Sequence, residues 1–357
     1  MSAPSSEMRL GDRPLGAGRR PLVIAELSGN HNGRIERALA LMDAAAAAGA
    51  DAVKLQTYTA DTITLDFDGP GFTIDGGPWD GRRLHELYRE AHTPWEWHEA
   101  LFAKGRALGI PVFSSPFDFS AVDFLETLGA PAYKIASFEC IDLPLIRRCA
   151  ATGKPLVIST GLASQTEIRE AVQAARSAGA RDLVLLHCVS AYPAPAREYN
   201  LRRIPDLALR FGVLSGLSDH TLGSATAVAA ACMGACLIEK HITLARADGG
   251  PDAGFSLEPA EFAALVRDVR DGFEALGQVA YERQESEKSN AQFRRSLYAV
   301  ADIGRGEALT ADNIRSIRPG FGLPPKHYEA LLGRRALRDI KRGTPIEWSL
   351  VTPAKES

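Results

Sequence analysis

VLSGLSDH (213–220) and CLIEKHIT (236–243) are two short apolar runs, each of which gives way to polar residues at its end. Each run has the length of a β-strand, and residues 221–235 between them can hold one helix. Runs that are apolar along almost their whole length are typical of strands buried on both faces, as in parallel sheets. The two runs therefore predict a strand, helix and strand of an α/β fold.

Six further runs of the same kind precede these two and alternate with amphipathic segments. In chain order they are PLVIAEL (21–27), DAVKLQT (51–57), IPVFSSP (110–116), AYKIAS (132–137), PLVIST (155–160) and DLVLLHCVS (182–190). Eight strand-and-helix units predict a closed (β/α)8 TIM barrel.

The helix boundaries also have sequence signals. Thr93 to Glu96 and Ser164 to Glu167 both have the form of a capping box. Pro259 opens an apolar-periodic segment that runs to Leu276 and is predicted to be the last helix of the ring. The barrel is therefore expected to close near residue 278.

Composition narrows the class of protein. Of the 357 residues 45% are hydrophobic and 24% charged, which is typical of a soluble globular protein, and a barrel of roughly 250 residues leaves room for a small second domain. The net charge is −3, and no block of like charge indicates a nucleic-acid or membrane partner, so local cations must hold any anionic substrate. No signal peptide or membrane span is recognisable, and we expect a cytoplasmic protein. The five cysteines are odd in number and lack metal-finger spacing, so we expect no disulfide.

The chain is expected to divide into four parts. Residues 1–20 are an N-terminal extension and residues 21–280 the barrel. Residues 281–292 (YERQESEKSNAQ) are a polar linker, and residues 293–357 are a second domain. In the second domain DIGRG (302–306) and DIKRG (339–343) form a weak repeat, which predicts two similar turns in a β-rich unit.

One connection of the predicted barrel is unusually long. Residues 58–92 separate the second strand from its helix and are rich in Gly, Asp and aromatic side chains. Long loops in compact domains are usually functional or disordered, and the aromatic content favours function. We expect a lid or a substrate-binding segment here.

Polar residues stand near the ends of the predicted strands, where (β/α)8 barrels carry their active sites. They are Glu26, Lys54, Gln56, Ser115, Lys134, Ser137, Ser159, Ser190, Tyr192, Ser218, His220, Glu239 and His241. Residues two apart on a strand share a face, so pairs such as Lys54 with Gln56 are predicted to converge at the barrel mouth. A single polar strand end can simply meet solvent, so the set as a whole carries this prediction.

His220 and His241 end neighbouring strands and can reach one point. Imidazole suits Mn, Fe, Co or Zn, and a site with two protein ligands leaves positions for water and a carbonyl oxygen. The other interpretation is that both are hydrogen-bonded core residues.

Lys54 and Lys134, with the hydroxyl groups of Ser137, Ser159 and Ser218, could bind a phosphate and a carboxylate. These groups predict a small phosphorylated acid as ligand. Either lysine could instead form a Schiff base with a keto substrate or a salt bridge. No Walker loop, G-x-G-x-x-G fingerprint or G-x-S-x-G elbow supports a nucleotide, nicotinamide or triad-hydrolase site.

Long motifs spread over the strands resemble those of the sialic acid synthase family. They are AELSGNHNG (25–33), VKLQTY (53–58), FSSPF (113–117), YKIAS (133–137), STG (159–161), GLSDHT (216–221) and EKHIT (239–243), and the similarity covers nearly the whole chain. The C-terminal segment resembles the SAF, or antifreeze-like, domain of that family, a small β-rich β-clip. The resemblance implies a domain-swapped homodimer in which the SAF domain of one subunit covers the barrel of the other.

The resemblance also implies roles for individual residues. It makes His220 and His241 ligands of a divalent metal, with Mn²⁺ expected and Mg²⁺ or Co²⁺ as alternatives. It implies phosphoenolpyruvate contacts from Lys54, Ser115, Lys134, Ser137, Ser159 and Ser218. Sugar-site or acid–base positions fall on Glu26, Gln56, Glu139, Tyr192 and Asp252, substrate contacts include Phe117 and Ser190, and Arg318 would reach the sugar's acyl-amino group across the dimer.

Three stretches are similar to the corresponding parts of pseudaminic acid synthases within that family. They are GGPWDGRRLHELYREAHTPWEWH (76–98), FRRSLYA (293–299) and RPGFGLPPKHYEALLG (318–333). This similarity implies condensation of phosphoenolpyruvate with 2,4-diacetamido-2,4,6-trideoxy-L-altrose and water, with C–O cleavage. Ser190 stands where sialic acid synthases have Asn, which argues against N-acetylmannosamine as the N-acylated sugar. The alternatives are an N-acetylneuraminate or legionaminate synthase, a Schiff-base aldolase, and a non-catalytic sugar-binding protein.

Overall fold

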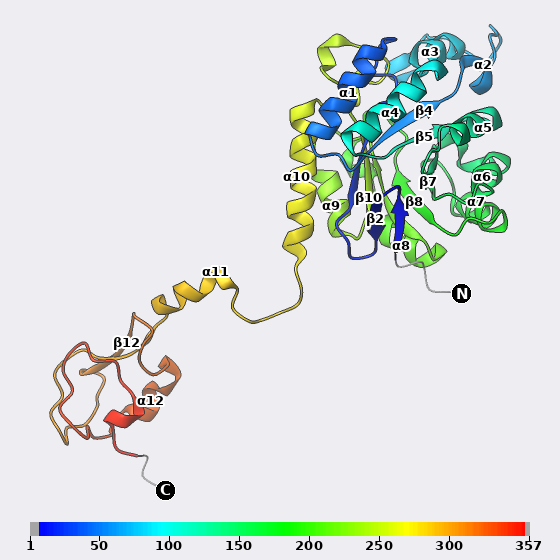
Figure 1. Ribbon diagram of the computed structural model, residues 1–357. Helices are drawn as coiled ribbons and strands as arrows, with labels where there is room; N and C mark the ends of the chain where they lie inside the picture. The colour runs from blue at the N-terminus through cyan, green and yellow to red at the C-terminus, as the bar shows by residue number, and fades with distance from the viewer. Residues whose placement is uncertain (1–6, 354–357) are drawn as a thin grey trace. The chain divides into compact units, whose positions relative to one another are not determined.

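A closed barrel of eight parallel strands forms the larger part of the protein (Figure 1). The computed structural model describes residues 7–353. The barrel strands are β3 (Leu22–Glu26), β4 (Ala52–Thr57), β5 (Val112–Pro116), β6 (Tyr133–Ile135), β7 (Leu156–Ser159), β8 (Leu183–Cys188), β9 (Leu214–Asp219) and β10 (Leu237–His241). Each pairs with the next, and β10 closes the ring against β3. The predicted (β/α)8 barrel is confirmed.

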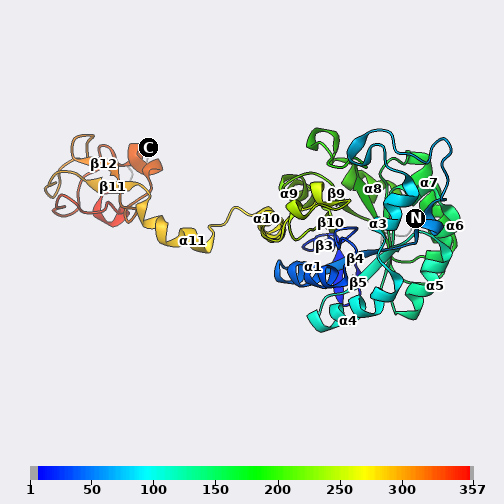
Figure 2. The same ribbon diagram turned by 90° about the horizontal axis from the view of Figure 1, so that it is seen from above.

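Helices surround these strands (Figure 2). The main helix after each strand in turn is α1 (Ile35–Ala47), α4 (His98–Leu108), α5 (Phe119–Thr127), α6 (Leu143–Ala150), α7 (Gln165–Ser177), α8 (Arg203–Phe211), α9 (Ala225–Cys232) and α10 (Pro259–Leu276). The long connection from β4 to α4 contains α2 (Ala60–Ile63) and α3 (Leu84–Ala91). No helix among the described residues is both long and apolar enough to cross a membrane.

The helix-start signals had different outcomes. Ser164 and Glu167 form the predicted capping box at the start of α7, and α10 runs from Pro259 to Leu276 as predicted. The prediction for Thr93 was wrong. A 3-10 turn (Trp95–Trp97) comes between Thr93 and the first residue of α4, His98, so the Thr93 side chain is too far upstream to cap the helix.

The strands separate two apolar layers. Outward-facing residues such as Val23, Val53 and Leu185 pack against the helices. Inward-facing residues near the amino ends of the strands, among them Ile24 and Phe113, fill the lower part of the barrel. Because side chains alternate along a strand, the inward positions nearer the carboxyl ends are those that carry polar groups.

An N-terminal hairpin closes the lower end of the barrel. It consists of β1 (Glu7–Leu10) paired antiparallel with β2 (Arg13–Gly16). Met8, Leu10 and Leu15 are buried in the same apolar cluster as the inward-facing residues at the amino ends of the strands. The hairpin is therefore part of the barrel core.

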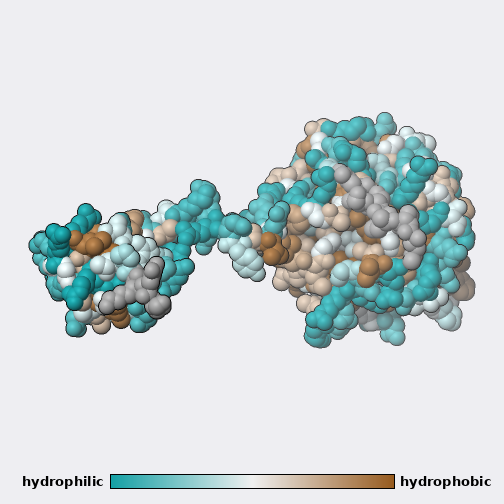
Figure 3. All heavy atoms as spheres, turned by 90° about the horizontal axis from the view of Figure 1, so that it is seen from below, coloured by the Kyte–Doolittle hydropathy of each residue, from teal (hydrophilic) through white to brown (hydrophobic). Residues whose placement is uncertain are grey.

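A second compact unit begins at Gln278. It contains α11 (Glu285–Lys288), α12 (Tyr328–Leu331) and the antiparallel pair of β11 (Ser296–Ala299) and β12 (Ile314–Ile317), with its own apolar core. The predicted pair of turns is present, at residues 305–306 and 342–343. The two segments also pair, because Ile303 and Ile340 exchange two backbone hydrogen bonds of 2.8 Å. Figure 3 shows hydrophilic residues over most of the visible surface, with hydrophobic residues in small groups.

Candidate active site

The polar strand ends line a cavity of about 420 Å³ at the carboxyl end of the barrel. The predicted site residues on its wall are Glu26, Lys54, Gln56, Phe117, Lys134, Ser137, Glu139, Ser159, Tyr192, Ser218, His220, His241 and Asp252. Cavities of this size hold small metabolites.

Three predicted site residues do not line the cavity. Ser115 lies behind the wall and accepts a hydrogen bond from Lys54 Nζ at 3.1 Å. Ser190 Oγ lies 2.8 Å from Ser137 Oγ, also one layer back. Arg318 belongs to the second unit.

Two lysines and two glutamates form a buried ionic network in the barrel. Lys54 Nζ lies 2.7 Å from Glu26 Oε2 and 3.6 Å from Glu239 Oε1, and Lys134 Nζ lies 3.8 Å from Glu239 Oε2. All four side chains are buried. Buried charges of this kind persist only when they are paired, and here each positive group has a carboxylate beside it.

Neighbouring neutral groups complete the network. Lys134 Nζ donates to Ser159 Oγ at 2.7 Å, Ser218 Oγ donates to Glu239 Oε1 at 3.3 Å, and Gln56 Nε2 donates to Glu26 Oε1 at 2.9 Å. Ammonium groups backed by hydroxyl groups are suitable for an anion with several oxygen atoms, such as a phosphorylated acid.

The environment shifts the pKa values of three of these charged groups. Burial lowers the pKa of Lys134, and burial raises the pKa of Glu26 against the opposing effect of Lys54. Burial alone would lower the pKa of Lys54, but Glu239 and Glu26 outweigh it and hold that pKa above its ordinary value. Lys54 is therefore held as a cation at neutral pH.

His220 and His241 both line the cavity, and each uses its Nδ1 elsewhere. His220 Nδ1 lies 2.9 Å from the carbonyl oxygen of Val189, and His241 Nδ1 lies 3.2 Å from Ser28 Oγ. A carbonyl oxygen can only accept, so His220 Nδ1 carries a proton, and Nε2 is the ring nitrogen on the side of Cys188, with which the His220 side chain also forms a hydrogen bond. The two ring centroids are 5.5 Å apart.

A divalent metal is compatible with this pair. Across residues 7–353, no group of three or more His, Cys, Asp or Glu side chains is placed to hold a metal ion. Two imidazoles oriented through Nδ1 are nevertheless a usual donor pair for such a metal, which would complete its coordination with water or substrate oxygen.

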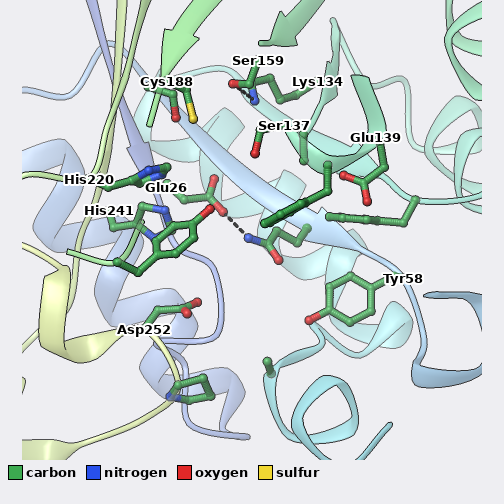
Figure 4. Close-up of a pocket in the computed structure, with 18 of the residues that line it drawn as sticks. Glu26, Tyr58, Lys134, Ser137, Glu139, Ser159, Cys188, His220, His241 and Asp252 are labelled. Atoms are coloured by element: carbon green, nitrogen blue, oxygen red, sulfur yellow. Dashed lines mark hydrogen bonds between the residues drawn. The ribbon is translucent and has the colours of Figure 1, made fainter. Parts of the chain in front are cut away.

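Two further carboxylates lie at the cavity. Asp252 Oδ2 accepts a hydrogen bond from the backbone N–H of Gly29 at 3.1 Å, and burial raises the pKa of Asp252. Burial also raises the pKa of Glu139, to about 7. In the view of Figure 4, His220 and His241 lie on one side of the cavity and Glu139 on the other.

Several cavity residues were absent from the predicted set. They are Tyr58, Ile63, Ile74, Trp79, Leu87, Tyr88, Ala91, Ala136, Phe138, Cys188, Pro251 and Phe255, while Glu239 was predicted among the polar strand ends but without a role. Cys188 could have been found, because it is the last inward-facing residue of β8, in step with Leu186. Most of the others belong to connections, where no periodicity tells which side chains turn inward.

Known proteins match the chain along most of its length. Residues 41–281 match the NeuB family and residues 294–352 match the SAF domain. A pseudaminic acid synthase of Campylobacter jejuni is 44% identical over 329 residues, which are 92% of this chain and 96% of that protein. A pseudaminic acid synthase of Helicobacter pylori is 42% identical, over 91% of this chain and 96% of that protein.

A solved structure shows the same architecture. The spore coat polysaccharide biosynthesis protein SpsE of Bacillus subtilis superposes with a TM-score of 0.66 at 32% identity, covering 98% of this chain and all of that one. The family match covers the barrel from within α1 to its end, with most of the cavity residues, and the SAF match covers most of the second unit. The chain therefore belongs to the NeuB family, with a C-terminal SAF domain.

Proposed function

We propose that this protein is a pseudaminic acid synthase, a phosphoenolpyruvate-dependent nonulosonic acid synthase. It condenses phosphoenolpyruvate with 2,4-diacetamido-2,4,6-trideoxy-L-altrose and water, giving pseudaminic acid and phosphate. Relatives with that name are 42% and 44% identical over more than nine-tenths of the chain. Phosphoenolpyruvate is a cytoplasmic metabolite, so the reaction would take place in the cytoplasm.

The observation that carries this proposal is the buried pair Lys54 and Lys134 facing the same cavity as His220 and His241. The lysines and their serine partners would hold the phosphate and carboxylate of phosphoenolpyruvate, because ammonium groups supply charge and hydroxyl groups supply direction. The sugar aldehyde would then lie toward the histidines and the mouth of the cavity.

The bonds of the reaction balance as follows. C3 of phosphoenolpyruvate forms a bond to C1 of the open-chain sugar, and the aldehyde oxygen takes up a proton. Water adds to C2 and loses a proton; the C2–O bond to phosphate then breaks, the remaining C2 hydroxyl becomes the keto group, and its proton leaves with the phosphate. Glu139, with a pKa of about 7, can exchange a proton at neutral pH, and Glu26 and Asp252 are the other candidates.

We propose that His220 and His241 hold a divalent metal through Nε2, with Mn²⁺ as the first candidate and Mg²⁺ or Co²⁺ as alternatives. When bound, the metal supplies a Lewis acid for a carbonyl oxygen. The partners of Nδ1, Val189 and Ser28, orient the two rings.

We further propose a homodimer in which the SAF domain of one subunit serves the cavity of the other. Exposed apolar side chains in connections and at helix starts around the carboxyl end of the barrel support it: Phe119, Phe138, Ile141, Leu162 and Leu222. Exposed groups of large apolar residues commonly mark protein interfaces. Arg318 would then contact the acyl-amino group of the sugar in the partner's barrel.

The test is a reconstituted reaction. Purified protein is incubated with phosphoenolpyruvate, Mn²⁺ and the altrose derivative, and the product is followed by mass spectrometry and phosphate release. The proposal predicts a metal-dependent nonulosonic acid and ¹⁸O from labelled water at C2. It fails if no amino sugar, including N-acetylmannosamine, gives product, and its pseudaminic part fails if N-acetylmannosamine is preferred.

Metal binding is measured separately from activity. Titration calorimetry with Mn²⁺ should show one site per chain in the wild type and none in His220→Ala or His241→Ala. Both variants should keep the wild-type circular dichroism spectrum. Unchanged Mn²⁺ affinity in both would remove the metal assignment.

A further inference from the structure

Residues 72–84, within the long connection after β4, form a small hairpin that extends over the cavity. The backbone N–H of Ile74 donates to the carbonyl of Arg82, and that of Leu84 donates to the carbonyl of Phe72, both at 2.9 Å. A third bond of 2.9 Å joins the N–H of Gly81 to the carbonyl of Ile74. The tip of this hairpin carries Trp79.

Trp79 is fixed against two other connections of the barrel. Its indole Nε1 donates to the carbonyl oxygen of Pro251 at 2.8 Å. Its ring lies 5.6 Å from that of Tyr192 and 6.4 Å from that of Phe255, measured between centroids. Trp79 is only half-exposed although its neighbours in the tip are mostly exposed, so the indole turns toward the cavity.

The hairpin and its flanking helices make one side of the cavity apolar. Ile63, Ile74, Trp79 and Leu87 all line the cavity, and all belong to the connection 58–92. The charged groups Lys54 and Lys134 come from the strands instead. The cavity therefore has a charged side built by strands and an apolar side built by this connection.

The apolar side has little capacity to bind an added hydroxyl group. The indole N–H of Trp79 is already donated to Pro251, and Ile74 has no polar side-chain atom. The polar side chains of the same connection that line the cavity, apart from Trp79, are Tyr58 and Tyr88; burial raises the pKa values of both hydroxyl groups, so both remain protonated donors. They are suited to the amide oxygens of an N-acylated sugar.

An open-chain hexose has a fixed order of groups along its length. If its C1 aldehyde lies toward the histidines, as the proposed function requires, C6 is the carbon farthest from the reaction. In a 6-deoxy sugar that carbon is a methyl group, and in most hexoses it carries a hydroxyl group. A methyl group gains from contact with Ile74 and Trp79, whereas a hydroxyl group would lose its hydrogen bonds with water there.

Resting on the proposed function, we infer that Ile74 and Trp79 are specificity-determining residues that receive the C6 methyl group of the sugar. An apolar wall can discriminate only modestly, in kcat/KM, between a sugar with a methyl group and one with a hydroxyl group at C6. The wild type should prefer 2,4-diacetamido-2,4,6-trideoxy-L-altrose over its 6-hydroxy counterpart by about 10- to 100-fold in kcat/KM.

Trp79→Ala and Ile74→Thr test the wall. Both should reduce the preference to below about threefold, mainly by raising KM for the 6-deoxy sugar, with KM for phosphoenolpyruvate unchanged. Trp79→Phe keeps an aromatic ring but loses the hydrogen bond to Pro251, and it should keep most of the preference. Leu209→Ala is the control, because Leu209 lies on α8 with 87% of its surface exposed.

The outcomes separate this inference from the proposed function. If the wild type turns over both sugars equally, or if the variants keep the wild-type preference, the inference is wrong and the proposed function stands. If the wild type turns over neither altrose derivative, the proposed function fails first. A proportional loss of activity with both sugars in Trp79→Ala and Ile74→Thr would assign the two residues a structural role only.

Discussion

Among single residues, Glu139 gives the clearest dependence on pH. Burial raises its pKa from an ordinary 4.5 to about 7, and Lys134 only partly opposes this. The folded state therefore binds the proton more tightly than the unfolded state between these values. The contribution of Glu139 to stability should fall as pH rises from about 4.5 to 7 and stay constant above 7.

The glutamine in Glu139→Gln cannot ionise, so the variant should lose both the pH dependence of stability and the ionisation that affects catalysis. The melting temperature of the variant, relative to wild type, should increase from pH 5 to 7. Its kcat/KM should fall about 100-fold or more and lose an ionisation near pH 7, if Glu139 transfers a proton. Persistence of that ionisation in the variant would show that another group titrates there.

The sequence predicted which residues face the cavity where they lie on a strand, because side chains alternate along a strand. Glu26, Lys54 and His241 reach the cavity because each is an inward position near the end of a strand. Cys188 occupies the same kind of position and was missed, because a cysteine at a strand end looks like core. Trp79 was missed because its direction depends on a hydrogen bond to Pro251, far away in the chain.

Among elements, β9 and β10 are joined by a buried ion pair on the outer face of the barrel. Lys240 Nζ lies 2.8 Å from Asp219 Oδ2, and neither side chain is exposed to solvent. Lys240→Met would leave Asp219 buried without its partner and should destabilise the barrel by about 3–5 kcal/mol. Urea unfolding measures this loss.

A double variant separates loss of the pair from loss of packing. Asp219→Asn combined with Lys240→Met should recover a large part of the stability, since no unpaired charge remains. Arg210→Met removes an exposed pair with Asp206 on α8 and should change little. Equal losses in the double and single variants would contradict this account.

Local sequence signals predicted where a helix starts only when no adjacent turn shifted the start. Ser164 caps α7 as expected, but the turn after Pro94 moved the start of α4 to His98, beyond the reach of Thr93. The repeated DIGRG and DIKRG segments predicted two turns. Their mutual pairing through Ile303 and Ile340 is a tertiary contact that the repeat alone could not specify.

For the whole molecule, the proposed homodimer predicts complementation. Arg318→Ala and His241→Ala should each be inactive alone. If the SAF domain of one subunit serves the other's barrel, a mixed dimer contains one site with both residues intact. Random mixing makes half of the dimers mixed, so about a quarter of wild-type activity should return.

The measurement is activity after the two variants are co-expressed, with the dimer checked by light scattering. No recovery in a mixture that contains mixed dimers would place Arg318 and His241 of one site in the same chain. The barrel itself was predictable from eight apolar runs, because each strand pairs with the strands that precede and follow it in the chain. The contact of Arg318 across a dimer rests on the family resemblance and stays a prediction, because assembly leaves no periodic pattern in one chain.

The hairpin of β1 and β2 under the barrel also bears on the order of events during turnover. Leu10 and Leu15 fill the lower end, so within residues 7–353 the carboxyl end of the strands is the open side of the cavity. The lysines come from the strands, and the hairpin 72–84 extends over the mouth. Under the proposed function, we therefore expect the smaller anion to bind first and the sugar second, with the sugar holding the anion beneath it until turnover.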